Sequence, residues 1–325
     1  MISKERFREI GNSLISDEDR REYNKKASAK NSIIKIAIPI ESVATIGLLI
    51  AGIILLATSG FLGLQLIMSA LFLALFSLGL DLVLIRVFGT YKWKQFKATY
   101  CQQLVEKIFE EYNCQFNVND YIYASVYNES NFGSSDYNRY GGEDLLTIDI
   151  PNSEGKPSGT KFRMSDISAI KKEMVTVTDN DGNQHEEEKT TVCYSGAFGY
   201  ARFARPFKCN LSINTWLTFM NKIKLEDIDF NKNFKVRTDN QVEALCILTP
   251  TVIMGLKSLH EHFDKVMMSF SGDTLYIGFP HANLFELGGG KTLDGTAFDN
   301  FYDDCANILY IVEEITNNDK IYKKD

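Results

Sequence analysis

The fold is decided by residues 42–88, whose sequence is SVATIGLLIAGIILLATSGFLGLQLIMSALFLALFSLGLDLVLIRVF. The tripeptide Thr58-Ser59-Gly60 divides this apolar stretch, and Asp81 and Arg86 are its only charges. A helix needs roughly 17–25 apolar residues to cross a bilayer, and each half has about that length. We therefore expect a transmembrane hairpin whose two helices cover about residues 42–59 and 62–88.

Basic residues flank the hairpin on both sides. They are Arg20, Arg21, Lys25, Lys26, Lys30 and Lys35 before it, and Arg86, Lys92, Lys94 and Lys97 after it. Positive charge next to a membrane helix stays in the cytoplasm. We expect both termini to be cytoplasmic, with a short turn on the other side. The apolar run begins too late for a signal peptide, so none is expected.

Two acidic residues, Glu41 and Asp81, lie inside or next to the expected spans. Counted from the turn, they should lie at similar depth near the cytoplasmic interface. Acids within a span are functional candidates by default. Alternatively, both lie at the headgroup boundary and pair with Lys35 and Arg86. Small residues at four-residue spacing leave close helix approach or self-association open; these are Gly47, Ala51, Ala70 and Ala74.

Composition divides the chain of 325 residues into four parts. Residues 1–32 form a polar cytoplasmic arm, and residues 33–88 contain the transmembrane hairpin. Residues 89–113 carry apolar side chains every three or four positions, which predicts a stalk helix. Residues 114–325 form a cytoplasmic domain that is long enough for one sizeable core.

The pattern within residues 114–325 changes to alternation typical of strands. Strands are expected at Tyr121–Tyr127 and Leu145–Ile150, and hairpins at Glu173–Tyr194, Phe198–Ile213 and Val266–Phe279. Thr249 is typical of an N-cap, and Pro250 of the first position of a helix. A last helix is expected to begin near Asp294. Strands that do not alternate regularly with helices indicate an α+β domain on a mainly antiparallel sheet.

Charge and cysteine content exclude some classes of protein. The net charge is −7, and no basic stripe of the kind that nucleic-acid binders carry is visible. The six cysteines are scattered without a zinc-type spacing, which favours reduced core residues. We therefore expect no nucleic-acid partner.

Two sequence motifs suggest a catalytic or ligand-binding site, but neither fits the pattern that such a site requires. The run Gly288–Thr292 lacks the first glycine of a phosphate-binding loop, because that position is Phe285. His260 and His262 are two residues apart, so on a helix they point in different directions and do not chelate one metal ion. We expect no catalytic, cofactor-binding or metal-ligating residue, and no cofactor.

Three segments carry a family resemblance: KLEDIDFNKNF (residues 224–234), DNQVEA (239–244) and ILTP (247–250). Together with Tyr194-Ser195-Gly196 and Leu284-Phe285-Glu286, this series resembles a bacterial membrane-protein family catalogued as domain of unknown function 3137. The resemblance covers most of residues 100–325. Family members commonly have Arg-Tyr where this chain has Leu245-Cys246.

The resemblance implies a protein of the bacterial cytoplasmic membrane with a cytoplasmic domain and no established activity. It supplies no catalytic residue. We expect the family-signature residues to be structural, acting in helix starts, turns and the core. They are Leu225, Glu226, Asp227, Phe230, Phe234, Asp239, Gln241, Glu243, Ala244, Leu248, Thr249, Pro250, Phe285 and Glu286.

The leading functional hypothesis is a membrane-tethered adaptor or regulatory module that binds another protein and is not an enzyme. The expected partners are the lipid bilayer and an unidentified cytoplasmic or membrane protein. One alternative is an enzyme or ligand sensor with a pocket in the α+β domain. A further alternative is an oligomerising bilayer sensor that acts through the hairpin, with Glu41 and Asp81 as its polar elements.

Overall fold

The computed structural model describes all residues except 33–34, 37, 60, 153, 179–183, 216–222, 286, 288–292 and 323–325. The chain forms two compact units, which are described separately. Unit 1 comprises residues 1–7, 101–286 and 299–325, and unit 2 comprises residues 8–100 and 287–298.

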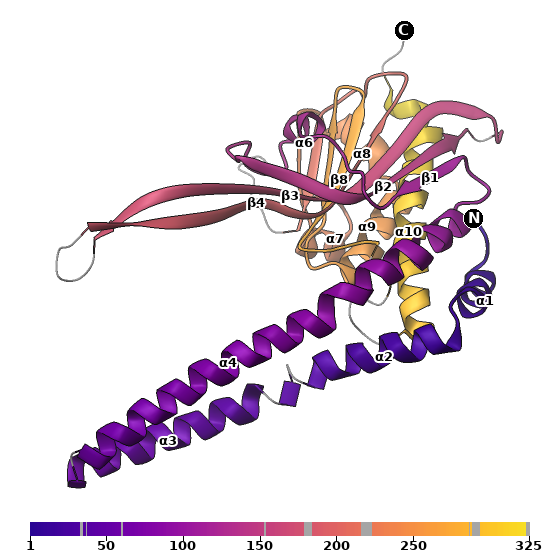
Figure 1. Cartoon of the computed structure of the whole chain (residues 1–325). Coiled ribbons are helices and arrows are strands. Elements are labelled where there is room, and N and C mark those ends of the chain that lie inside the picture. Colours follow the sequence, from indigo (N-terminus) through magenta and orange to yellow (C-terminus); the bar gives the residue numbers. More distant parts are fainter. Residues whose placement is uncertain are drawn as a thin grey trace. The chain divides into compact units, whose positions relative to one another are not determined.

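Unit 2 contains the hairpin. Its main helices are α2 (Asp17–Ser32), α3 (Ile38–Ser59) and α4 (Phe61–Phe96), while α1 (Lys4–Leu14) begins in unit 1 (Figure 1). Residues Ile38–Thr58 and Phe61–Val83 are long and apolar enough to cross a membrane, as the sequence predicts. Helices α8 (Gln241–Ile247) and α9 (Pro250–His262) are long and apolar enough only when taken together. They are bent by 72° relative to each other, so they would count as one broken span.

Close packing of α3 against α4 depends on small residues near the turn. A Cβ atom on Gly63 would lie 2.1 Å from the backbone nitrogen of Leu56, and one on Gly52 would lie 2.6 Å from the side chain of Ile67. Ala70 is also buried, whereas a Cβ on Gly47 would meet nothing within 4 Å. Small residues therefore permit the contact between the two helices, as expected for membrane helices, but Gly47 takes no part in that contact.

Aromatic side chains join α2 to the end of α4 within unit 2. The rings of Tyr23 and Phe96 have centroids 5.0 Å apart, and those of Phe96 and Tyr100 are 4.9 Å apart. The Tyr100 hydroxyl donates a hydrogen bond of 2.5 Å to the Asp19 carboxylate. The polar arm is therefore helical in α2 and held to the base of the hairpin.

The described residues of unit 1 form one eight-stranded sheet in which every neighbouring pair is antiparallel. The strand order is β1-β2-β3-β4-β8-β7-β5-β6. The strands are β1 (Cys114–Asn117), β2 (Arg139–Pro151), β3 (Pro157–Thr178), β4 (Gln184–Arg202), β5 (Leu211–Asn214), β6 (Lys235–Thr238), β7 (Met267–Ser271) and β8 (Thr274–Pro280). This arrangement confirms the predicted α+β fold on an antiparallel sheet.

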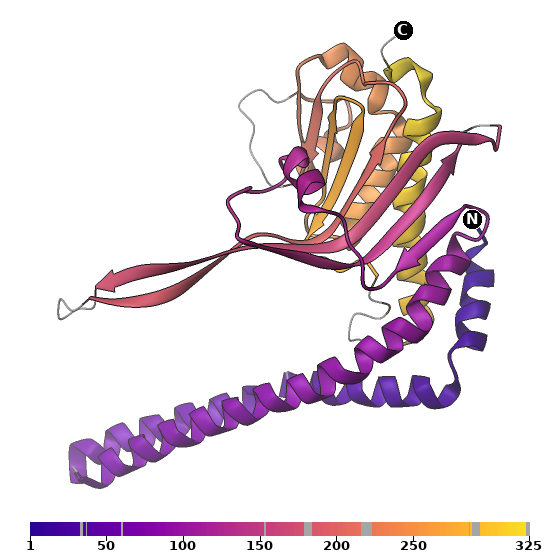
Figure 2. The same ribbon diagram turned by 45° about the horizontal axis from the view of Figure 1, so that its top comes forward.

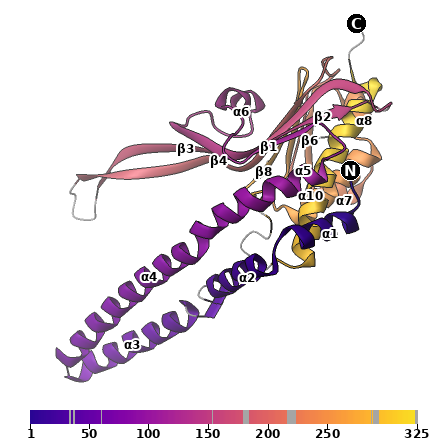
Figure 3. The same ribbon diagram turned by 45° about the vertical axis from the view of Figure 1, so that its right-hand side comes forward.

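The two faces of the sheet differ in what covers them. The remaining helices are α5 (Gln102–Ile108), α6 (Ala124–Ser130), α7 (Ile228–Asn233) and α10 (Gly295–Asn317), with short turns η2 (Lys97–Cys101) and η3 (Asp319–Ile321). Figures 2 and 3 show α6 on one face and α10 on the other. The face toward α10 presents buried apolar side chains such as Phe162 and Phe279, and we call it the helix-covered face. The opposite one is the open face.

Helix α9 begins where the sequence predicts. The Thr249 hydroxyl accepts a hydrogen bond from the backbone of Val252, and Pro250 occupies the first turn. A Cβ on Gly255 would lie 2.8 Å from the side chain of Ile311, so α9 and α10 approach each other closely there. The hairpin expected at Val266–Phe279, which is β7–β8, and the last helix, α10, are also present.

Two expectations for the strands are wrong. Residues Tyr121–Tyr127 do not form a strand, because α6 begins at Ala124 and buries Tyr127 against the sheet. Residues Phe198–Ile213 do not form a hairpin, because β4 pairs with β8 and β5 pairs with β6 and β7. In both cases tertiary packing overrides the local alternation of apolar residues.

Gly196 lies where β4 first pairs with β8, and its conformation requires glycine. Its φ angle is +142°, and a Cβ would lie 2.3 Å from the carbonyl oxygen of Phe279 and 2.8 Å from the backbone nitrogen of His281. Side chains rarely adopt such a conformation, and the contacting atoms are backbone atoms that do not move aside easily.

We predict that Gly196→Ala destabilises the protein by about 2 kcal/mol or more, because it adds backbone strain and overlap in a packed sheet. The apparent Tm of the purified chain in detergent should fall by several degrees. Gly141→Ala in β2 is the matched control, since a Cβ there meets nothing within 4 Å. Equal Tm values for the two variants would contradict this role of Gly196.

Candidate functional site

The apolar family-signature residues lie in the core of unit 1. Phe230, Phe234, Ala244, Leu248 and Phe285 are all buried. The rings of Phe230 and Phe234 stack with centroids 4.5 Å apart, and the ring of Phe285 lies 5.1 Å from that of Phe116. These side chains therefore pack the core of unit 1. The signature residue Glu286 lies outside the described residues.

Asp227 shows how the polar signature residues act. Its carboxylate caps α7 by accepting a hydrogen bond of 2.8 Å from the backbone of Phe230, and it pairs with Lys257 at 2.5 Å. The Lys257 hydrogen bond and the capping bond lower the pKa of the Asp227 carboxyl. The segment is further closed by the Asn231 side chain, which bonds both backbone groups of Leu225.

Asp239 and Glu243, two further polar signature residues, also bind nearby groups. Asp239 accepts hydrogen bonds of 2.9 and 2.8 Å from the backbone and side chain of Asn210. Glu243 pairs with Lys208 at 3.4 Å. Glu226 and Gln241 are exposed. These contacts fix turns and helix starts, and they do not bring the carboxylates together in a cavity.

The structure brings the two acids of the hairpin together. The carboxyl groups of Glu41 and Asp81 are within hydrogen-bonding reach of each other. Asp81 is 5% exposed, and Glu41 is at the first turn of α3. They therefore lie at the same depth in the hairpin, and their functional role stays a prediction.

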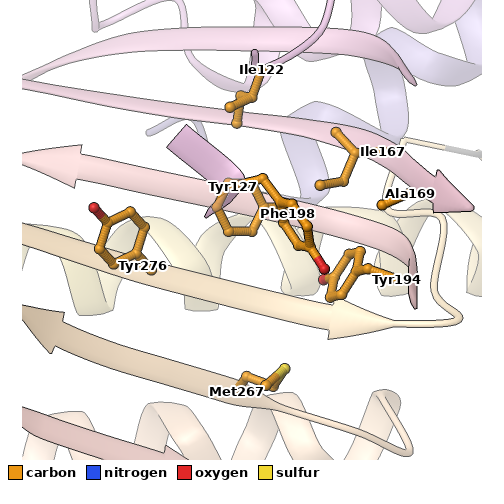
Figure 4. Packing of buried hydrophobic residues seen from close by; sticks show 8 residues of the cluster. All are labelled: Ile122, Tyr127, Ile167, Ala169, Tyr194, Phe198, Met267 and Tyr276. Carbon is orange, nitrogen blue, oxygen red and sulfur yellow. The ribbon is translucent and has the colours of Figure 1, made fainter. Parts of the chain in front are cut away.

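A cluster of aromatic residues fills the part of the open face that α6 covers. Figure 4 shows Tyr127 beside Phe198 and Tyr194. The Tyr194 hydroxyl donates a hydrogen bond of 2.7 Å to the carbonyl oxygen of Ala197, whereas the buried Tyr127 hydroxyl has no hydrogen-bond partner among the described residues. Burial raises the pKa of both hydroxyls well above the usual range, so both stay protonated.

Beside α6, the open face holds a groove of about 340 Å³. Strand register places Lys161 opposite Arg202 and Arg163 opposite Tyr200, so the four side chains share one face of β3 and β4. The Arg163 guanidinium contacts the Tyr200 hydroxyl at 3.2 Å. Phe203 and Val126 also line the groove, which we call the basic groove.

A two-stranded extension of the sheet is formed by Lys171–Thr178 and Gln184–Thr191, and we call it the ribbon. Strand β3 pairs with β2 only as far as Ile170, and β4 pairs with β8 only from Gly196 onward. Within the described part of the chain, the two ribbon strands therefore pair only with each other. Figure 1 shows the ribbon extending beyond the rest of the sheet.

His260 and His262 have separate partners. The Nδ1 atom of His260 lies 3.2 Å from the carbonyl oxygen of Phe263, and that of His262 lies 2.5 Å from the Asp304 carboxylate. Among the described residues, no group of three or more His, Cys, Asp or Glu side chains is placed to hold a metal ion. The His262–Asp304 pair instead links the end of α9 to α10.

The basic groove and the full ribbon are the features that sequence reasoning missed. The signal for the groove is alternation, since Lys161 and Arg163 are two residues apart, as are Tyr200 and Arg202. Alternation alone does not say that these two pairs face each other, because the register of β3 and β4 joins residues far apart in the sequence.

Two apolar helices and an α+β unit on an antiparallel sheet define the class as a two-span membrane protein with an α+β domain. Residues 192–317 match the model of the family described as "Protein of unknown function (DUF3137)", which confirms the resemblance drawn from the sequence. The matched segment contains most of β4, the strands β5–β8 and the helices α7–α10. No curated protein and no solved structure matches the chain.

We predict that Asp304 makes stability depend on pH. Burial raises its pKa from 3.8 to about 6, although His262 opposes the shift. A carboxyl whose pKa is higher in the folded state than in the unfolded state stabilises the fold while it is protonated. This contribution is complete below the unfolded-state pKa, and it is lost as the pH rises through the folded-state pKa. The unfolding free energy should therefore fall by about 2 kcal/mol between about pH 4 and pH 7 through this group.

The measurement is the apparent Tm of the full chain in detergent across that pH range. Asp304→Asn, which is neutral at every pH, should show a smaller decline in Tm than the unmodified protein. Glu261→Gln removes an exposed carboxylate next to His262 and is the control. An Asp304→Asn profile parallel to that of the unmodified protein would show that Asp304 is not the titrating group.

Proposed function

We propose that the chain is a membrane-tethered adaptor of the bacterial cytoplasmic membrane, whose ribbon binds an extended segment of another protein. The open backbone edge of the ribbon is the observation that carries this proposal. In this arrangement the hairpin is the anchor, the sheet of unit 1 is the rigid scaffold, and the ribbon is the binding element.

The orientation follows from the basic flanks of the hairpin. Lys and Arg next to membrane helices favour the cytoplasmic side, which supports a cytoplasmic location for both termini and unit 1. The short connection between α3 and α4 leaves little protein on the opposite side of the membrane. A binding module in unit 1 would therefore meet cytoplasmic partners or the cytoplasmic parts of membrane proteins.

The outer edge of β3 offers unpaired backbone groups. The Asn138 side chain accepts a hydrogen bond from the Lys172 nitrogen and donates one to the Lys172 carbonyl oxygen, so the backbone of Lys172 points away from β4. Because a strand alternates, the backbone groups of Met174 and Thr176 point the same way. Exposed strand edges of this kind accept an added strand from a partner.

The charge on the ribbon defines the kind of partner. Residues 171–191 carry six carboxylates against three lysines, and Glu186, Glu187 and Glu188 are consecutive on β4. Lys171 and Lys172 are already paired with acids. Charges on an edge strand also discourage uncontrolled self-pairing. The partner segment is therefore extended and basic.

The test is photo-crosslinking of the full chain in native bacterial membranes. A crosslinker replaces Met174 on the ribbon, where the side chain is 60% exposed, or Met254 on α9, where it is 69% exposed. We expect one discrete protein adduct at position 174 and none of the same mass at position 254. The adduct yield should fall as salt screens the acidic ribbon.

Two substitutions of Thr176 distinguish a role of its backbone N–H group from a role of its side chain. Thr176→Pro removes the outward N–H group and should abolish the adduct, whereas Thr176→Ala keeps that group and should leave the yield within about two-fold. Equal apparent Tm values establish that both variants are folded. Scattered adducts, or an adduct indifferent to Thr176→Pro, would show that the ribbon edge is not the binding site.

A further inference from the structure

We propose that the basic groove binds a phosphate monoester, with Arg163 as the main contact to the phosphate group. This site is separate from the ribbon edge and does not depend on the proposed adaptor role. It lies on the open face, on the parts of β3 and β4 that are flanked by β2 and β8.

The arrangement of positive charge in the groove is the first argument. Lys161 and Arg202 are directly opposite each other across β3 and β4, and like charges in that position destabilise a strand pair. Arg163 is two residues from Lys161 on the same face. A bound anion between these three side chains would remove the repulsion.

The free donors of Arg163 are the second argument. Its guanidinium contacts the Tyr200 hydroxyl, and within the described part of the chain it has no carboxylate within 4.0 Å. An arginine carries five N–H donors in a planar fork that matches two oxygens of a phosphate group. The Tyr200 contact holds the guanidinium at the groove and leaves donors available for a ligand.

The nearby carboxylates pair with Lys161 and Arg202, and within the described part of the chain none of them pairs with Arg163. Asp149 lies 3.3 Å from Lys161, and Glu129 and Asp273 lie 3.7 and 3.9 Å from Arg202. The side chains in these pairs are 35–60% exposed, and exposed ion pairs are weak and readily exchanged.

Phosphate fits this set of groups better than a carboxylate. Three cationic side chains line the groove. A phosphate monoester offers three terminal oxygens and a double negative charge, whereas a carboxylate offers two oxygens and one charge. Phe203 and Val126 provide an apolar wall for the organic part of the ester. The groove volume of about 340 Å³ falls within the usual range for small-ligand sites.

The experiment is isothermal titration calorimetry of the full chain in a maltoside detergent and phosphate-free buffer. The probes are inorganic phosphate, glycerol 3-phosphate and dihexanoyl phosphatidic acid, with succinate as the carboxylate control. We expect saturable binding of the phosphate probes and weaker binding of succinate. Tighter binding of phosphatidic acid than of glycerol 3-phosphate assigns the ligand to lipid headgroups, and equal binding assigns it to soluble esters.

Variants test the assigned residues. Arg163→Gln should weaken binding of the phosphate probes about ten-fold or more, and Arg163→Lys should have an intermediate effect because it keeps the charge without the fork. Arg237→Gln is the matched control, since strand register places Arg237 on the same face, exposed and outside the groove. If Arg163→Gln fails to fold, Arg202→Gln replaces it with the same expected loss.

Three results would overturn the proposal. They are the absence of saturable binding by every phosphate probe, equal affinity in a folded Arg163→Gln or Arg202→Gln variant, and succinate binding as tight as that of glycerol 3-phosphate. The Arg237→Gln control distinguishes loss of a specific contact from a general loss of positive charge on the open face.

Discussion

The antiparallel pairing of β3 with β4 is the constraint on which the rest of unit 1 depends. Its register places Phe162 and Met164 on the helix-covered face, and Lys161 and Arg163 on the open face. A slip of one residue in β3 would bury two cations under α10 and expose two large apolar side chains. The apolar core therefore fixes the basic groove without any contribution from a ligand.

The hairpin obeys a different constraint, since its surface is apolar on nearly all sides. Helix association there cannot depend on removing apolar surface from water, so it depends on close packing. Gly52, Gly63 and Ala70 supply that packing near the turn. Glu41 and Asp81 are at the other end of the hairpin, where their carboxyl groups meet.

Features governed by nearby residues could be predicted from the sequence, and features governed by distant pairing could not. The length of the apolar stretch predicts the hairpin, and Thr249-Pro250 predicts the start of α9. The signature segments indicate the resemblance to the family whose model matches residues 192–317, but they do not predict the contacts of Asp227. The apolar residues of Tyr121–Tyr127 alternate as in a strand. Tyr127 nevertheless belongs to a helix, and it is buried against aromatic residues of β4 that lie far away in the sequence. The basic groove needs the register of β3 and β4, which no local pattern contains.

The junction between sheet and ribbon explains one part of the family resemblance. Ala169 pairs with Tyr194 and Ile170 with Val192, so Cys193 is an extra residue in β4. Such a bulge bends a strand and increases its twist. Within three residues of it, Gly196 adopts a conformation that favours glycine and begins the pairing with β8. Tyr194-Ser195-Gly196 is therefore the point at which β4 leaves the ribbon and joins the sheet. A change there would alter both the direction of the ribbon and the alignment of Tyr200 and Arg202 in the groove, although it touches neither site.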